Sequence, residues 1–198
     1  MILQGSNLDF RYRNGEFILR GVTITVTSGE VVGLLGPSGR GKSTLAKILA
    51  GYLRPAKGQL SIDGKAIPGK GYHPVQLIFQ HPEKAVNPRW KMSRTITEGY
   101  KPDMELMKIL DIQENWLNRY PNELSGGELQ RFCVLRALSD KTRFLICDEI
   151  TTMLDALTQA RIWNFLLRYA RERQIGVLLI THSWVLADKT CTRIISWD

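Results

Sequence analysis

The strongest constraint in this sequence is a glycine-rich segment that directly follows a short apolar run. The run, Val31–Leu35, leads straight into a segment of the form GxxxxGKS. Glycines let the backbone wrap closely around anionic oxygens, so that several N–H groups point at the same phosphates. A strand, a loop and a helix in this order therefore predict a nucleoside triphosphate site. Its residues are Gly36, Pro37, Ser38, Gly39, Arg40, Gly41, Lys42, Ser43 and Thr44.

Two side chains of this loop have predictable chemistry. Lys42 is expected to reach the β- and γ-phosphates, and Ser43 is expected to offer its hydroxyl to Mg²⁺. The alternative is an ordinary turn that matches the pattern by chance. The strand expected before the loop and the helix expected after it favour phosphate binding over that alternative.

A second apolar run, Phe144–Cys147, ends in two carboxylates, Asp148 and Glu149. At the end of a buried strand beside the phosphate loop, Asp148 is expected to hold Mg²⁺. Glu149 points elsewhere in this interpretation and accepts a proton from an attacking water. The alternative is an exposed acidic pair at a strand end.

Apolar and amphipathic stretches alternate along the chain, which indicates an α/β fold with a largely parallel sheet covered by helices. Asp63 and Gly64 form a hairpin-turn dipeptide, so we also expect an N-terminal antiparallel patch. Strands are predicted at Leu8–Tyr12, Val22–Val26, Val31–Leu35, Gln59–Ile62, Val75–Phe79, Phe144–Cys147, Val177–Thr181 and Arg193–Trp197.

Helices are predicted where apolar residues recur at helical spacing between start and stop signals. They are Lys42–Ala50 with Gly51 as its stop, Gly126–Leu138 with a capping box from Ser125 to Glu128, and Ala156–Gln174 with Gly176 as its stop. Four prolines interrupt residues 81–123, where a short apolar stripe predicts a small helical insert.

Composition narrows the class of protein. The chain has 198 residues, of which 43% are hydrophobic and 23% charged, and these values predict one globular domain over residues 1–198. The net charge of +8 suits phosphate ligands, nucleic acid or an anionic membrane surface equally well. Cys133, Cys147 and Cys191 are scattered, as reduced core thiols of a cytosolic protein are. We expect no signal peptide and no membrane span, because every apolar run is far shorter than about 20 residues.

A third segment, Leu124–Arg131, places Ser125, Gly126 and Gly127 at the start of a helix, where exposed N–H groups favour an anion. A bare helix start is the alternative. This segment resembles the signature motif of the ATP-binding cassette (ABC) ATPases. The two segments above and further motifs of that family occur in the family's order over nearly the whole chain. The resemblance implies a P-loop NTPase (RecA-like) core with an antiparallel β patch and a helical insert.

The resemblance also implies roles for single residues. Tyr12 matches the aromatic on which the family stacks adenine, with a core tyrosine at a strand end as the alternative. Gln80 matches the Q-loop glutamine, which contacts Mg²⁺ or water. Asp155 matches the D-loop, and His182 the switch histidine that contacts the γ-phosphate. Glu149, His182 and Gln80 are then the expected catalytic residues.

Two cassettes of this family meet head to tail, so Ser125 and Gly127 are expected to serve the ATP of a second subunit. Residues 81–123 and the helix after the signature match the helical subdomain, which receives the permease. The implied partners are a second ABC ATPase in a heterodimer or homodimer, integral-membrane permease subunits and, indirectly, a solute-binding protein, but no nucleic acid. The implied location is peripheral, on the cytoplasmic face of the inner membrane.

A finer resemblance lies just after the Q-loop. Phe79–Pro82 and Ala85–Arg89 look like the corresponding segments of oligopeptide and nickel importer ATPases. The alternatives are an exporter ATPase, an ABC protein of DNA repair or translation, and a regulatory subunit that does not hydrolyse ATP. Positions that depart from the usual pattern are Arg40, Ile150, Thr152, Met153 and Ser183.

Overall fold

A five-stranded parallel sheet in the order β6-β7-β8-β3-β9 forms the centre of the protein. The structure is a computed structural model that describes residues 1–13, 15–69, 71–151 and 154–197. Strands β7 and β8 are buried along their whole length, as continuous apolar strands are when helices or a second sheet cover both faces. The strands are β3 Val31–Leu35, β6 Val75–Ile78, β7 Phe144–Asp148, β8 Gly176–Thr181 and β9 Arg193–Ser196.

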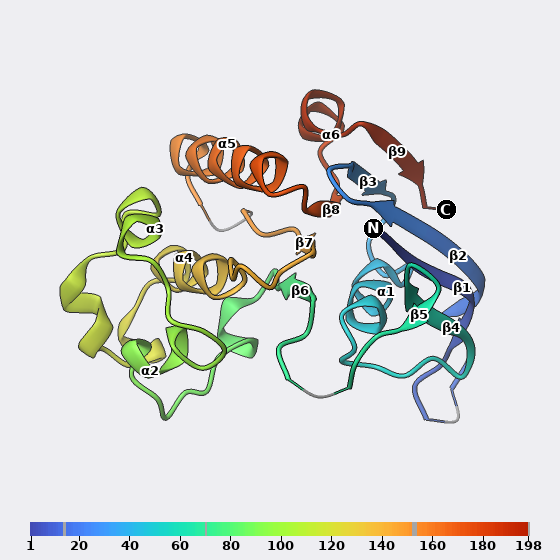
Figure 1. Cartoon of the computed structure of the whole chain (residues 1–198), viewed down its shortest axis with the longest axis horizontal. Coiled ribbons are helices and arrows are strands. Elements are labelled where there is room, and N and C mark those ends of the chain that lie inside the picture. Colours follow the sequence, from blue (N-terminus) through green and yellow to red (C-terminus); the bar gives the residue numbers. More distant parts are fainter. Residues whose placement is uncertain (14, 70, 152–153, 198) are drawn as a thin grey trace.

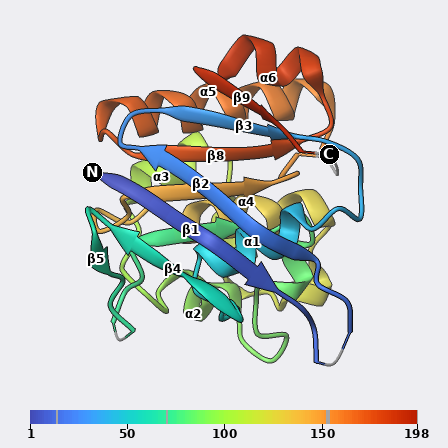
Figure 2. The same cartoon turned by 90° about the vertical axis from the view of Figure 1, so that its right-hand side faces the viewer.

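A four-stranded antiparallel sheet in the order β2-β1-β4-β5 packs against this centre and faces the viewer in Figure 2. The turn between β4 and β5 lies at Asp63 and Gly64, whose φ angles are 51° and 73°. Left-handed geometry at both turn positions matches the twist of the paired strands. The predicted antiparallel patch is therefore confirmed. Its strands are β1 Ile2–Phe10, β2 Leu19–Thr27, β4 Lys57–Ile62 and β5 Lys65–Ala66.

Helices divide the molecule into two lobes (Figure 1). Helix α1 lies between the two sheets, whereas α2, α3 and α4 form a lobe on the other side of the parallel sheet. Residues 81–123, predicted as a helical insert, contain only short helices. The helices are α1 Lys42–Leu49, α2 Met92–Ile96, α3 Met104–Ile109, α4 Gly126–Arg136, α5 Ala156–Glu172 and α6 Trp184–Thr190, with 3-10 helices η1 Pro82–Lys84, η2 Glu114–Asn118 and η3 Pro121–Glu123.

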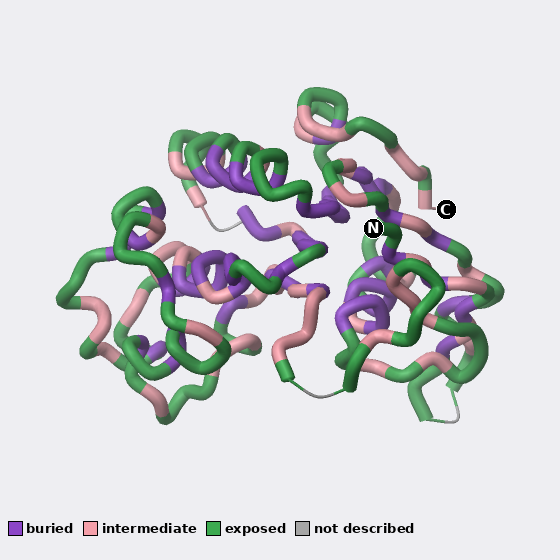
Figure 3. Tube along the Cα trace, in the orientation of Figure 1, coloured by how far each residue is buried: buried purple, intermediate pink, exposed green. Residues whose placement is uncertain are grey.

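The parallel sheet separates two apolar cores, because alternate side chains of a strand point to opposite faces. Along β7, Phe144 and Ile146 pack with α1 and the antiparallel sheet, and Leu145 and Cys147 pack with α4 and α5. Figure 3 shows α1 and the central strands buried and the loops around them exposed. The fold is the predicted α/β class with both faces of the sheet covered, which leaves the strand ends free to carry a site.

The first strand differs from its prediction. Strand β1 begins at Ile2 instead of Leu8, and it ends at Phe10, before Tyr12. Its pairing with β2 shifts register just before Leu8, where Asn7 has a φ of 49°. This irregularity breaks the alternation of polar and apolar residues, and alternation is the signal by which a strand is recognised from sequence.

The end of α5 also differs. The helix ends at Glu172, and Gln174, with a φ of 52°, takes the left-handed position after it. The predicted stop at Gly176 is therefore wrong, since this glycine opens β8. A Cβ atom there would lie 2.7 Å from both the Phe144 ring and the Thr27 carbonyl oxygen. Gly176 is needed for close packing, not for ending a helix.

The three cysteines are free thiols. Cys133 and Cys147 are buried, and burial raises the pKa of each thiol to about 12. Burial also raises the pKa of the half-buried Cys191. None of the helices in the described ranges combines the length and the apolar character that crossing a membrane requires.

Candidate active site

The segment after β3 forms a loop whose shape depends on glycine. Gly39 and Gly41 have φ angles of 80° and 91°, a region that other residues rarely adopt. Gly41 is also the N-cap residue of α1, directly before the helix begins at Lys42. The loop thus passes from a buried strand into a helix, the arrangement that directs backbone N–H groups at an anion.

A cavity of about 280 Å³ lies over this loop. It is where the carboxyl ends of the parallel strands meet, the usual ligand position in such sheets. All of its lining residues except Ile18 were predicted as site residues from the sequence. The cavity is lined by Ile18, Ser38, Gly39, Gly41, Lys42, Ser43, Thr44, Gln80, Glu149 and His182.

Lys42 is buried at the first turn of α1, and its ammonium group lies back against the loop. The Nζ atom donates to the carbonyl oxygens of Gly36 at 2.7 Å and Pro37 at 2.6 Å. Burial lowers the pKa of Lys42, although the nearby charges of Glu149 and Asp148 oppose this change. The amine is therefore held by weak acceptors that a phosphate can replace with a charge-assisted contact.

Asp148 and Ser43 form the candidate metal position. Asp148 is buried at the end of β7, and burial raises its pKa while a hydrogen bond from Ser43 opposes the rise. A buried carboxylate beside a hydroxyl is the hard oxygen donor set that Mg²⁺ prefers, so these residues fit that ion. Among the described residues, no group of three or more His, Cys, Asp or Glu side chains gathers as a metal cluster.

Glu149 is held by contacts from two other segments. Its φ angle of 50° turns the chain off β7, a conformation that costs about 1–3 kcal/mol for residues other than glycine. Gln80 donates from Nε2 to Glu149 Oε2 at 2.7 Å, and Nε2 of His182 contacts Oε1. The carboxylate is thus aimed into the cavity with both oxygens engaged, an orientation suited to accepting a proton from water.

His182 connects this carboxylate to the phosphate loop. Its Nε2 atom lies 3.1 Å from the Ser38 hydroxyl as well as in contact with Glu149. The histidine follows β8, and Ser183 caps helix α6 by accepting a hydrogen bond from the Leu186 N–H at 3.2 Å. Strand β8 and this cap place the imidazole at the cavity.

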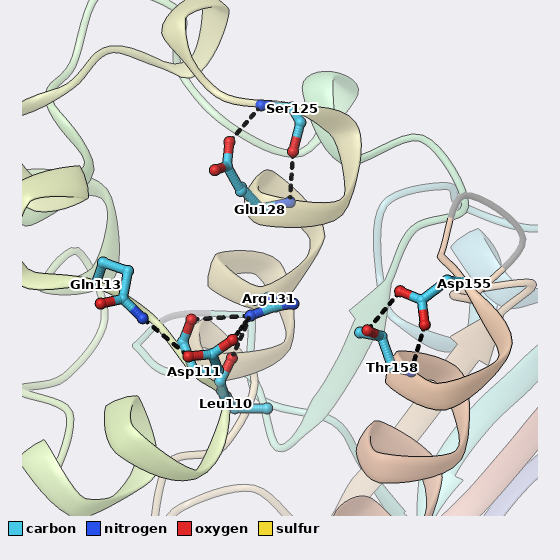
Figure 4. A network of polar contacts seen from close by, with 8 residues as sticks. All are labelled: Leu110, Asp111, Gln113, Ser125, Glu128, Arg131, Asp155 and Thr158. Atoms are coloured by element: carbon cyan, nitrogen blue, oxygen red, sulfur yellow. Dashed lines mark hydrogen bonds and ion pairs between the residues drawn. The ribbon is translucent and has the colours of Figure 1, made fainter.

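Ser125, Gly126, Gly127 and Asp155 lie at a second cavity, of about 430 Å³, formed by the starts of α4 and α5. Ser125 and Glu128 form the predicted capping box, with N–H to oxygen distances of 2.7 and 3.2 Å (Figure 4). This cavity shares no lining residue with the first. The structure therefore does not bring these four residues to the phosphate loop of the same chain.

Asp155 caps α5 in a similar way. Its carboxylate accepts the N–H groups of Leu157 at 3.1 Å and Thr158 at 3.0 Å, and also the Thr158 hydroxyl at 2.6 Å. These hydrogen bonds, that of the Thr158 hydroxyl first, lower the pKa of Asp155. Thr152 and Met153, which precede it, lie outside the described residues.

Tyr12 is not among the residues that line the phosphate-loop cavity. It is 47% exposed and packs edge to face on Phe10, with ring centroids 4.8 Å apart. Its exposure does not match the alternative of a core tyrosine at a strand end. Gly36, Pro37 and Arg40 belong to the loop but do not line the cavity either.

Three contributions to these sites could not be seen in the sequence. Ile18 adds an apolar wall to the phosphate-loop cavity. Gln130, buried in α4, donates to the Phe79 carbonyl oxygen at 3.2 Å, next to Gln80. Arg131 joins α4 to the end of α3 through Asp111 at 2.6 Å (Figure 4). Gln130 and Arg131 are the last two residues of the signature segment, but their contacts with Phe79 and Asp111 depend on neighbours that are distant in sequence.

A larger cavity, of about 720 Å³, lies between the chain before α3 and helix α5. Its charged lining is balanced, with Lys101, Lys141, Arg168 and Arg173 against Asp103, Asp140, Glu105 and Glu172. The hydroxyls of two tyrosines in its lining donate to backbone carbonyl oxygens of the Leu135–Leu138 segment. The charges named in this lining balance, and both tyrosine hydroxyls already have hydrogen-bond partners.

Comparisons with known proteins agree with the geometry. The family model described as ABC transporter matches residues 19–152. Nickel import system ATP-binding protein NikE from Staphylococcus aureus strains MSSA476 and MW2 is 33% identical over 207 residues, which cover 98% of this chain and 85% of the relative.

Solved structures show the same fold. The ATP-binding cassette MJ0796, in a dimeric post-hydrolysis state bound to ADP and Pi, matches with a TM-score of 0.84 and 25% identity over 99% of this chain and 94% of that one. A bacterial Atm1-family ABC exporter with ATP bound matches in fold, with a TM-score of 0.83 and 24% identity, over 100% of this chain and 37% of that one. The chain therefore belongs to the ABC transporter family, as a cassette that binds and hydrolyses ATP.

Proposed function

We propose that this ABC ATPase binds Mg-ATP over the phosphate loop and energises a membrane importer. The observation that supports the site is that one cavity gathers Lys42, Gln80, Glu149 and His182 from four separate segments of the chain. The nucleotide-binding domain extends over residues 1–198 in this proposal. Residues 81–123 and α4 form its helical subdomain.

Each group has one role in the proposed reaction. Lys42 leaves the Gly36 and Pro37 carbonyls for the β- and γ-phosphates. Glu149 accepts a proton from the attacking water, while Gln80 and His182 orient its carboxylate. Mg²⁺, held by Ser43 and Asp148, would neutralise charge on the phosphate oxygens.

Two further contributions lie outside the cavity. Tyr12, exposed after β1, stacks on adenine, a contact worth about 1–3 kcal/mol per base in stacking platforms. Ser125, Gly126, Gly127 and Asp155 serve the nucleotide of a second cassette. Their separate position supports this, since they form a cavity of their own at the starts of two helices.

Import, not export, is supported by the relatives named as nickel import ATP-binding proteins. The cargo class is nickel complexes or small peptides. The partners are a second cassette, identical or different, permease subunits and, through them, a solute-binding protein. The ATPase lies on the cytoplasmic face of the membrane, where ATP is present.

The test is reconstitution of the chain with a second cassette and permease subunits in lipid nanodiscs. We expect Mg-ATP hydrolysis to rise several-fold when the binding protein is added with Ni²⁺ or with a peptide mixture. The isolated chain should be a slow ATPase, because its signature residues act on another subunit's nucleotide. A fast rate in the isolated chain that does not depend on concentration would contradict the shared site. Absence of stimulation by either cargo would contradict the importer assignment.

A further inference from the structure

The last strand of the parallel sheet ends against the phosphate loop. Strand β9 pairs with β3, and the next residue, Trp197, continues the pairing by donating its backbone N–H to the Leu35 carbonyl oxygen at 2.6 Å. Its indole Nε1–H donates to the Arg40 carbonyl oxygen at 2.7 Å. One residue therefore bonds to the last residue of β3, just before the loop, and again to the middle of the loop.

Packing strengthens this attachment. A Cβ atom on Gly36 would lie 1.9 Å from the carbonyl oxygen of Trp197, so only glycine permits the approach. The Gly36 carbonyl oxygen also accepts from Lys42 Nζ. The half-buried Trp197 packs against the core that contains α1. The first half of the loop is thus held by contacts with both Trp197 and Lys42.

The direction of the bond to Arg40 has a consequence for anion binding. In a planar trans peptide, the C=O of one residue and the N–H of the next point in opposite directions. The Arg40 carbonyl accepts from the indole, so the N–H of Gly41 points away from Trp197. Gly41 lines the phosphate-loop cavity. Fixing the carbonyl therefore fixes the direction of an N–H that a phosphate would use.

We infer that Trp197 is a positioning residue that holds the phosphate loop in the shape that binds nucleotide. The inference rests on the proposed nucleotide site, and Trp197 itself touches no nucleotide in it. A loop that is ordered beforehand loses less conformational entropy on binding. Trp197 therefore raises the affinity for nucleotide. It does not set the turnover number at saturating ATP, which depends on Glu149 and the side chains that contact it.

The test uses Trp197→Phe, which keeps an aromatic ring and removes the N–H donor. The dissociation constant for Mg-ADP should rise about three- to tenfold, the effect of losing one hydrogen bond, and KM for ATP should rise in parallel. The turnover number should stay within about twofold. Trp197→Leu, which also removes the ring, should weaken binding further.

Trp90→Phe is the matched control. Trp90 is half-buried in the helical lobe, where the Arg94 guanidinium lies 4.0 Å from its ring centroid, and it lines neither nucleotide-related cavity. This variant should bind Mg-ADP as the unaltered protein does. Equal affinity in Trp197→Phe and Trp90→Phe would overturn the inference, as would a loss of turnover without a change in KM.

Hydrogen–deuterium exchange of the unaltered protein gives a second test, which does not depend on folding of a variant. Mg-ADP should slow exchange at residues 193–197 together with residues 36–41. Protection of the loop without protection of β9 would overturn the inference. Failure of the unaltered protein to bind Mg-ADP would contradict the proposed nucleotide site instead, so the two failures are distinguishable.

Discussion

The phosphate-loop cavity and the signature cavity differ in what their polar side chains bond to. In the first, functional groups from distant segments contact one another, as Gln80 does Glu149 and His182 does Ser38. In the second, Ser125 and Asp155 bond to the backbone of their own helices. The first cavity is therefore assembled by contacts between segments, whereas the two caps of the second are local to their helices and, among the described residues of its lining, only Arg131 bonds to a distant side chain, Asp111.

This difference predicts how each cavity responds to substitution. Removing one functional side chain from the phosphate-loop cavity leaves its hydrogen-bond partners in contact with other side chains. ATP hydrolysis should therefore fail while the protein still folds. Removing a cap in the signature cavity should lower stability and leave nucleotide binding by the single chain intact. The variants below test this contrast.

Lys42→Ala should have the largest effect. The substitution removes the lysine that lines the phosphate-loop cavity, and with it a charge-assisted contact to phosphate. ATPase activity should fall to background, and affinity for Mg-ATP should fall at least about tenfold, as loss of a charged hydrogen bond predicts. Isothermal titration and phosphate release measure both. Lys65→Ala, on the exposed strand β5, is the control and should behave as the unaltered protein. Turnover near normal in Lys42→Ala would refute the site.

Glu149→Gln should separate binding from chemistry. The amide keeps the shape and reach of the side chain but cannot accept the proton, and general-base catalysis contributes about 10²–10⁴-fold. Turnover in the reconstituted complex should fall by that factor while Mg-ATP still binds. Glu114→Gln, an exposed position in the helical lobe, serves as the control. If Glu149→Gln hydrolyses ATP normally, the base lies elsewhere.

Ser125→Ala should act on the second cavity alone. Loss of the cap should lower the free energy of unfolding by about 1 kcal/mol, whereas Ser125→Thr keeps the hydroxyl and should lose little. Thermal unfolding measures this difference. The Mg-ADP dissociation constant of the isolated chain should not change in either variant. A weaker constant in Ser125→Ala would mean that the two cavities are coupled within one chain.

Local patterns account for what the sequence could predict. The strand, glycine loop and helix of the phosphate site are contiguous, and so are the Ser125–Glu128 capping box and the Asp63–Gly64 turn. Contacts between distant segments have no such pattern. The donation of Gln130 to Phe79 and of Trp197 to Arg40 depends on which strands become neighbours in the sheet. Glycine at position 176 was misread for the same reason, because its neighbours Phe144 and Thr27 are distant in sequence.

Glu30→Gln should have the smallest effect, and it tests the end of β9 that lies farthest from the loop. Glu30 accepts from Arg193 Nε at 2.8 Å and from the Thr27 N–H at 2.9 Å. Burial alone would raise the pKa of Glu30, but the bond from Arg193, followed by that from Thr27, outweighs it and the pKa is lowered from 4.5. A lowered pKa stabilises the folded state at pH values above the ordinary pKa, and this stabilisation disappears as the pH falls through the folded value.

At pH 7, therefore, Glu30→Gln should unfold with about 0.5–1 kcal/mol less free energy than the unaltered protein, the range for a partly exposed ion pair. The difference should shrink as the pH falls below 4.5 and disappear once the pH is below the lowered folded pKa, since the carboxyl group is then protonated in both folded and unfolded chains. Urea denaturation at a series of pH values falling from about 7 measures this, with the exposed Glu16→Gln as the control. Affinity for Mg-ADP should be unchanged, because Trp197, not Arg193, contacts the phosphate loop. A difference that persists at low pH would show that the amide disturbs packing at the start of β3, and that charge is not the cause.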